Sequence, residues 1–181
     1  MNDIDLKLIK LASGLVGPTA RKADLFFTTS EDFFSQAIRQ RTWGEFSHVQ
    51  IITRITEEGK IEVVSADAQG VCCRDAREEE FEHFAILTYP EMTDKEREDV
   101  CKFCFSQIGK PYDFVGLASF LFYKELQNDD RWFCSELAYI AYKQAGIRLQ
   151  RRVKQDFISP RDLYISPLLK PIDGNAEYDW T

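Results

Sequence analysis

The feature that most constrains the fold is a pair of β-branched runs in the middle of the chain. Residues 47–53 and 61–66 are rich in Val, Ile and Thr, and a Glu-Glu-Gly-Lys turn separates them. This pattern predicts a β-hairpin. Two further apolar runs, at 70–73 and 84–88, would complete an antiparallel sheet, and residues 24–27 have the pattern of a short buried strand.

Helix signals surround this sheet. Thr93 and Glu96 form a capping box that opens a helix extending to about residue 108, and Ser159 followed by Pro160 is typical of a helix start. Other helices are expected at residues 5–15, 31–39, 115–126 and from 134 to near 146. The charged run 74–82 is expected to be a solvated loop or a helical turn. Helices gathered around one antiparallel sheet predict an α+β domain.

The charge balance narrows the classes of function. The chain of 181 residues carries 23 Lys and Arg against 30 Asp and Glu, a formal net charge of −7. A general nucleic-acid binder needs a surplus of cations, and so does a protein held to anionic lipid by charge alone. The acidic balance therefore argues against both of these classes. With 44% hydrophobic residues and no repeat or linker, we expect one domain over 1–181, in which residues 1–21 form a helical extension.

The amino-terminal residues and the cysteines favour the cytoplasm. Asp3 and Asp5 stand where a secretory signal would carry positive charge. The longest apolar stretch, at 115–122, falls short of the roughly 18 residues that a membrane span needs. Without a signal, the five cysteines are expected to stay reduced. We therefore expect a soluble cytoplasmic protein with no transmembrane segment.

Cys134 and His48 have the residue types of a nucleophilic pair. Cys134 falls at a predicted helix start, where free N–H groups and the helix dipole favour a thiolate and lower the thiol pKa. His48 interrupts an apolar strand and would be its base. Both also have structural interpretations, as a core cysteine and a buried, hydrogen-bonded histidine. The second histidine, His83, adjoins an acidic run and is expected at the surface.

Two other groups of residues have competing interpretations. Cys72-Cys73 with Cys101-x-x-Cys104 would supply four thiolates to a zinc site. Adjacent strand cysteines point to opposite faces, however, and the second pair recurs with apolar residues at helical spacing, so we expect core packing and no metal. The basic clusters at 39–41 and 148–154 are either solvated faces or a rim that selects anions.

Five motifs, taken in order, resemble one family. They are Asp24-Leu25-Phe26-Phe27, Thr42-x-Gly44-x-Phe46-Ser47-His48-Val49, Gly109-Lys110-Pro111-Tyr112-Asp113-Phe114, Trp132-Phe133-Cys134-Ser135-Glu136-Leu137, and Ser159-Pro160-x-Asp162-Leu163-Tyr164. The series spans about residues 22–169 and resembles the circularly permuted papain-fold cysteine hydrolases, specifically the YiiX-like branch of the NlpC-type superfamily. The resemblance implies a permuted papain-like fold, with an antiparallel sheet or small barrel packed against several helices.

The same resemblance implies roles for individual residues. Cys134 matches the nucleophile and His48 matches the base, and no cofactor is required. Family members usually orient the histidine with a glutamate, whereas this chain has Ser65 at the matching position. A hydroxyl can hold an imidazole by a hydrogen bond but brings no charge. Asp67 and Gln50 are therefore alternative orienting residues.

The implied activity is cleavage of an amide bond by a cysteine peptidase or amidase, through an acyl-enzyme. The substrate would be a small peptide, a cell-wall-type peptide or an amide- or ester-linked lipid, in a cleft lined by Tyr112, Trp132 and Ser135. Related superfamily members are acyltransferases, so transfer to a lipid or amine acceptor is an alternative. A third is a non-catalytic binding module whose triad has decayed.

Overall fold

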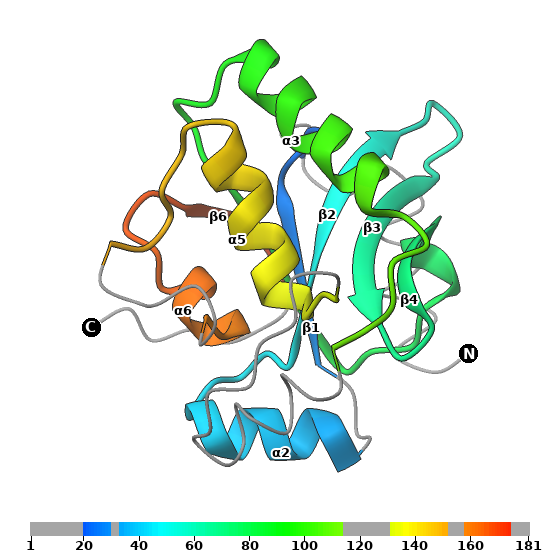
Figure 1. Cartoon of the computed structure of the whole chain (residues 1–181), viewed down its shortest axis with the longest axis vertical. Coiled ribbons are helices and arrows are strands. Elements are labelled where there is room, and N and C mark those ends of the chain that lie inside the picture. The colour runs from blue at the N-terminus through cyan, green and yellow to red at the C-terminus, as the bar shows by residue number, and fades with distance from the viewer. Residues whose placement is uncertain (1–19, 30–32, 114–130, 152–157, 175–181) are drawn as a thin grey trace.

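The computed structural model describes residues 20–29, 33–113, 131–151 and 158–174, and its centre is an antiparallel sheet (Figure 1). Within these residues the sheet has six strands in the order β4-β3-β2-β1-β5-β6. The strands are β1 (Leu25–Thr29), β2 (His48–Ile55), β3 (Ile61–Asp67), β4 (Gly70–Asp75), β5 (His83–Thr88) and β6 (Lys170–Gly174). The predicted hairpin is β2–β3, and the short buried strand is β1, which lies between β2 and β5.

Helices pack around this sheet. They are α2 (Phe33–Thr42), α3 (Asp94–Gln107), α5 (Cys134–Gln144) and α6 (Pro160–Tyr164), with a short 3-10 turn η1 (Ala76–Glu78) after β4. Figure 1 shows α3 and α5 lying across the sheet, with α2 below it. Because α5 is apolar over most of its surface, eight of its residues are buried against β2, β3 and α3.

Strand alternation divides the core into two parts. Val49, Ile51 and Val64 point toward α5 and join the larger cluster, which contains Cys134 and Leu137. The opposite face carries a smaller cluster that includes Phe26, Ile52 and Val63. The start of α5 therefore packs against the side of β2 that carries Val49 and Ile51.

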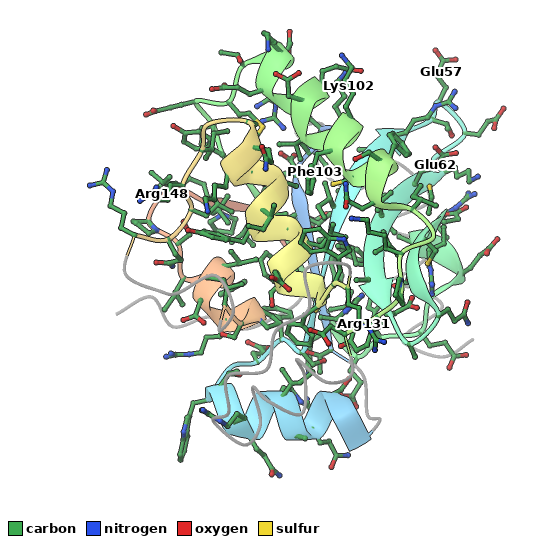
Figure 2. The ribbon with its side chains drawn as sticks, in the orientation of Figure 1. Glu57, Glu62, Lys102, Phe103, Arg131 and Arg148 are labelled. Carbon is green, nitrogen blue, oxygen red and sulfur yellow. The ribbon has the colours of Figure 1, made fainter. Side chains whose placement is uncertain are left out.

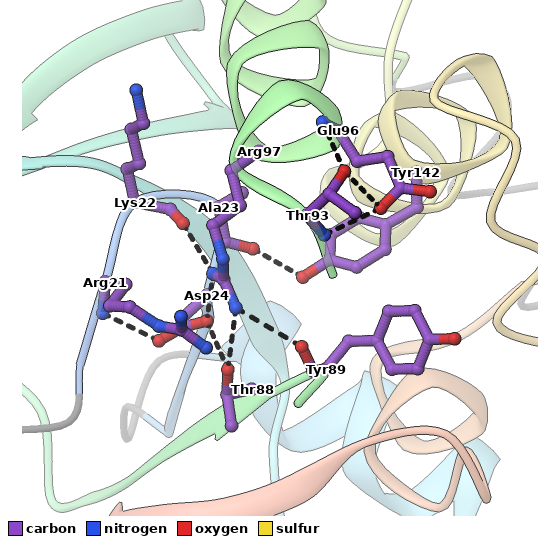
Figure 3. A network of polar contacts seen from close by, with 10 residues as sticks. All are labelled: Arg21, Lys22, Ala23, Asp24, Thr88, Tyr89, Thr93, Glu96, Arg97 and Tyr142. Atoms are coloured by element: carbon purple, nitrogen blue, oxygen red, sulfur yellow. Dashed lines mark hydrogen bonds and ion pairs between the residues drawn. The ribbon is translucent and has the colours of Figure 1, made fainter. Parts of the chain in front are cut away.

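A buried ion pair joins α3 to Asp24, the residue just before β1 (Figure 3). Arg97 is 1% exposed, and its Nη1 lies 2.7 Å from Oδ1 of Asp24, which is fully buried. The guanidinium also donates to the carbonyl of Lys22 at 2.7 Å and to the hydroxyl of Thr88 at 3.2 Å. From α5, the hydroxyl of Tyr142 donates to the carbonyl of Ala23. These contacts fix both helices against the sheet.

Most predicted elements are confirmed where the structure describes them. The capping box of Thr93 and Glu96 opens α3, and Ser159 caps α6 with Pro160 in its first turn. The run 74–82 contains the 3-10 turn, although Phe81 within it is buried. Three expected features lie outside the described residues: the helices at 5–15 and 115–126, and the amino-terminal extension 1–21 over most of its length. The edge strand β6 was not predicted.

Candidate active site

Cys134 is the first residue of α5, as the sequence predicts. Phe133 is the N-cap in an extended conformation, and it supplies no side-chain hydrogen bond to the helix. The thiol is 1% exposed, and its sulfur accepts hydrogen bonds from the amides of Val49 and Ser135. The sulfur therefore lies where the start of α5 meets the start of β2.

The register of the sheet explains why Val49 has an amide available for this contact. On one side β2 pairs with β1, where Phe27 is opposite Val49 and Thr28 is opposite His48. On the other side the pairing of β2 with β3 begins only at Ile51 and Val64. Val49 therefore lies before the first paired residue of the β2–β3 ladder. Half-buried His48 begins this segment, next to the residue that contacts the nucleophile.

The thiol of Cys134 is protonated in this arrangement. Burial raises the pKa of Cys134 to about 12, and the hydrogen bonds from the amides of Val49 and Ser135 only partly oppose that rise. The expectation of a lowered pKa at the helix start is wrong for this state. The helix start still favours the thiolate, but here the thiolate would lose nearly all its water, and that cost is larger.

The three candidates for orienting His48 occupy different environments. The carboxylate of Asp67 already has other partners, because it forms an ion pair with Arg74 and accepts a hydrogen bond from the amide of Gln69 at 2.8 Å. Continuing the β2–β3 register sets Ser65 opposite Gln50. Both are fully buried, and among the residues that the structure describes the hydroxyl of Ser65 and Oε1 of Gln50 have no hydrogen-bond partner.

Glu79, which the sequence reasoning missed, fixes the amide of Gln50. Nε2 of Gln50 donates to the carboxylate of Glu79, so Oε1 is the end of the amide that stays unused. Burial raises the pKa of Glu79, while the bond to Gln50 and the charge of Arg74 oppose the rise. Glu79 sits in the charged run after β4, where composition alone indicates only a solvated segment.

The expected cleft residues lie close to Cys134, and they are well packed. Trp132 is 8% exposed, and its indole N–H donates to Oε1 of Gln107 at 3.2 Å. Phe103 of α3, labelled in Figure 2, packs edge-on against this ring. The centroids of the two aromatic rings are 5.9 Å apart. Ser135 is fully buried and donates its hydroxyl to the carbonyl of Ile158 at 2.7 Å. Half-buried Tyr112 retains more accessible surface than either.

A series of backbone contacts holds the segment before Cys134. Gly70 opens β4 at φ +100°, and a Cβ there would lie 2.6 Å from the carbonyl of Lys110. The next residue, Val71, donates to that carbonyl at 2.8 Å. Tyr112 then forms a parallel bridge with Trp132, two residues before the nucleophile. The turn after α3 therefore docks on the sheet and positions the entry to α5.

The remaining cysteines lie in two separate parts of the fold. Cys101 and Cys104 are buried in the α5-side core, whereas Cys72 is half-buried and Cys73 exposed on β4. Burial raises the pKa of Cys101 to about 11. Across the residues that the structure describes, no three His, Cys, Asp or Glu side chains gather so as to hold a metal ion.

A comparison with protein families decides the assignment. Residues 19–162 match the model of the permuted papain-like amidase enzymes of the YaeF/YiiX type, the C92 family. The chain belongs to this family. Membership confirms the resemblance found in the sequence, the permuted papain-like fold and the class of cysteine peptidase or amidase-like hydrolase.

Solved structures give the same fold. One similar structure is described as the metalloprotein yiiX from Escherichia coli O157:H7, with a TM-score of 0.67 and 19% sequence identity. The match covers 89% of this chain and 98% of that chain. The described residues here do not fit a metal, since they contain no such cluster. No curated protein matches the sequence. Among the helices that the structure describes, none is long and apolar enough to cross a bilayer.

Proposed function

We propose that the protein hydrolyses an amide bond through an acyl-enzyme on Cys134, with His48 as general base and then general acid. The observation that carries this proposal is the contact of Cys134 with Val49, because it sets the predicted nucleophile beside the residue that follows the predicted base. The two residues come from elements far apart in sequence, and the proposal requires that the imidazole of His48, the first residue of β2, reaches the sulfur around the start of the strand.

The raised thiol pKa supports a particular order of proton transfer. Since the resting thiol is neutral, His48 would accept its proton as the sulfur attacks the carbonyl carbon, rather than from a thiolate–imidazolium pair formed in advance. A helix-start N–H, such as that of Cys134, would hold the oxyanion. His48 would then protonate the leaving amine, and water would release the acyl group.

Gln50 is the orienting residue that we favour for His48. It lies two residues after His48, on the same face of β2, and its unused Oε1 is an acceptor for an imidazole N–H. Glu79 holds the other end of the amide. The resting thiol and imidazole are both neutral in this proposal. A neutral amide is therefore a sufficient partner for the imidazole, because there is no imidazolium charge to stabilise at rest. Ser65 offers a second unused acceptor, whereas Asp67 is paired with Arg74.

Several finer assignments belong to the same proposal. The substrate is a small peptide, a cell-wall-type peptide or an amide- or ester-linked lipid, and Tyr112 is the cleft residue with the most accessible surface among those predicted. The chain acts in the cytoplasm as one catalytic domain over 1–181. Acyl transfer to a lipid or amine, and binding without turnover, are the competing functions.

Turnover of a panel of N-acyl aminomethylcoumarins, with peptidyl and fatty acyl groups, tests the proposal. Cys134→Ala should abolish coumarin release, and His48→Ala should lower kcat by at least about a hundredfold. Cys101→Ala is the matched control, because it removes a buried thiol of the same core, and it should leave activity nearly unchanged.

The outcomes separate the three functions. Release that depends on an added amine or lipid acceptor would assign an acyltransferase. Absence of release from every member, with the wild-type fold intact, would favour the binding module. Greater loss in Cys101→Ala than in Cys134→Ala would overturn the choice of nucleophile.

A further inference from the structure

Trp43 is the most exposed large hydrophobic residue among those described, at 89% of its full surface. It also has a positive φ of 54°, a conformation that a bulky side chain rarely adopts. An indole in water with a strained backbone adds nothing to the stability of the fold. Burial in the core therefore does not explain why Trp43 is held in this position.

Arginines lie on both sides of Trp43. Arg39 and Arg41 occupy the last turn of α2, and the amide of Gly44 donates to the carbonyl of Arg39 at 3.3 Å. On the other side, a Cβ built on Gly44 would lie 2.8 Å from Cβ of Arg161, so α6 packs closely against this loop. Figure 1 shows the end of α2 and α6 on the same side of the molecule.

A second exposed apolar side chain belongs to the same place. Ile165 is the C-cap of α6, and its amide donates to the carbonyl of Arg161 at 3.0 Å, so the two residues are one turn apart. Ile165 is 43% exposed, and Arg161 is exposed beside it. We call Trp43, Ile165 and the three arginines 39, 41 and 161 the Trp43 surface.

The charge of this surface is opposite to that of the chain. The formal net charge is −7, yet exposed Arg161 and half-buried Arg39 and Arg41 lie beside two exposed apolar side chains. Two acids also lie here. The carboxylate of Asp162 is held by Ser159 at the start of α6. Burial raises the pKa of Glu45, while the charges of His83 and Arg39 act to lower it. Charge alone would not hold an acidic protein on a membrane, but an indole and arginines together fit the interface of an anionic bilayer.

We propose that the Trp43 surface binds the surface of an anionic lipid membrane, with the indole among the headgroups and the arginines on lipid phosphates. Trp43 precedes His48 by five residues, so the contact would hold the loop that leads into β2 against the bilayer. This binding does not depend on turnover, and therefore it is tested separately from the hydrolase proposal.

Co-sedimentation with vesicles tests the proposal. The full chain should pellet with vesicles of phosphatidylglycerol and phosphatidylcholine, and should remain largely in the supernatant with phosphatidylcholine alone. Trp43→Ser should lose most of the bound fraction. Arg39→Gln and Arg161→Gln should each weaken binding about fivefold, the contribution expected of one cation near an anionic surface. Added salt should weaken binding as well.

Phe105→Ser is the matched control, because Phe105 is an exposed aromatic residue on α3, 46% exposed and outside this surface. It should bind vesicles as the wild type does, and circular dichroism should show the same fold for every variant. The proposal is overturned if wild-type protein ignores the anionic vesicles, binds both compositions equally, or loses no binding in Trp43→Ser. Equal loss in Phe105→Ser would also overturn it.

Discussion

The backbone amide of Val49 donates to the sulfur of Cys134, and through this contact the start of β2 meets the start of α5. The amide is available because the pairing of β2 with β3 begins two residues later, at Ile51. A strand that joined its neighbour along its whole length would use this donor in the ladder. The site therefore depends on the late start of β2–β3 pairing as much as on the start of α5.

The first prediction concerns the reactivity of Cys134. Because burial raises its pKa to about 12, the rate of its alkylation by iodoacetamide should rise about tenfold per pH unit between about pH 7 and 9, without a plateau. Peptide mass spectrometry measures the rate at each cysteine. In the urea-unfolded chain the same thiol should level off above about pH 8.5. A plateau near neutral pH in the folded protein would contradict the buried, protonated thiol.

Buried thiols should also make the stability of the protein depend on pH. Burial raises the pKa of Cys104 as well as that of Cys134, so both keep their protons in the folded chain after they ionise in the unfolded one. Their contribution is complete below about pH 8.5 and is lost as the pH rises above it, by about 1.4 kcal/mol per pH unit for each thiol. Urea unfolding at increasing pH measures this slope. Cys104→Ala should have a shallower slope, and an unchanged slope would refute the assignment.

Arg97 should contribute far more to the free energy of unfolding than the exposed charged residues of α3 do. Arg97→Met leaves the buried carboxylate of Asp24 without its cation, which should lower the free energy of unfolding by about 3–5 kcal/mol. Lys95→Met is the control, because the ion pair of Lys95 with Asp99 is exposed and its loss should hardly change stability. Equal effects of the two substitutions, measured by urea denaturation, would argue against the buried network.

The choice of Gln50 as orienting residue can be separated from the alternative of Asp67. Gln50→Leu should lower kcat on an amide substrate at least about tenfold with little change in KM, because the imidazole loses its acceptor. Asp67→Asn should lower kcat less, since the carboxylate of Asp67 is paired with Arg74. The opposite ranking would make Asp67 the orienting group. Urea unfolding of both variants controls for a purely structural loss.

Local signals predicted much of the fold. The hairpin of β2 and β3 follows from β-branched runs, and the two helix starts at Thr93 and Ser159 follow from their capping boxes. By contrast, β6 contains Pro171 and Gly174 and is largely exposed, so it lacks the alternation that identifies a strand. It forms only because β5 offers an edge.

The site was predictable only in part. The sequence singles out Cys134 and His48 by residue type and by resemblance to the family, and the structure sets the cysteine beside the strand that the histidine begins. The direction of the pKa shift of Cys134 was not predictable, because it depends on burial by residues distant in the chain. The bond of Glu79 to Gln50 also joins segments 29 residues apart, which no local pattern reports.

The most direct test of the account is to trap the acyl-enzyme with p-nitrophenyl acetate and locate the acetyl group by intact and peptide mass spectrometry. The account predicts one acetyl group on Cys134, formed at least about a hundredfold more slowly in His48→Ala and at the wild-type rate in Cys101→Ala. Acetylation of the exposed Cys73 instead, or formation on Cys134 at the same rate without His48, would contradict the pairing of these two residues.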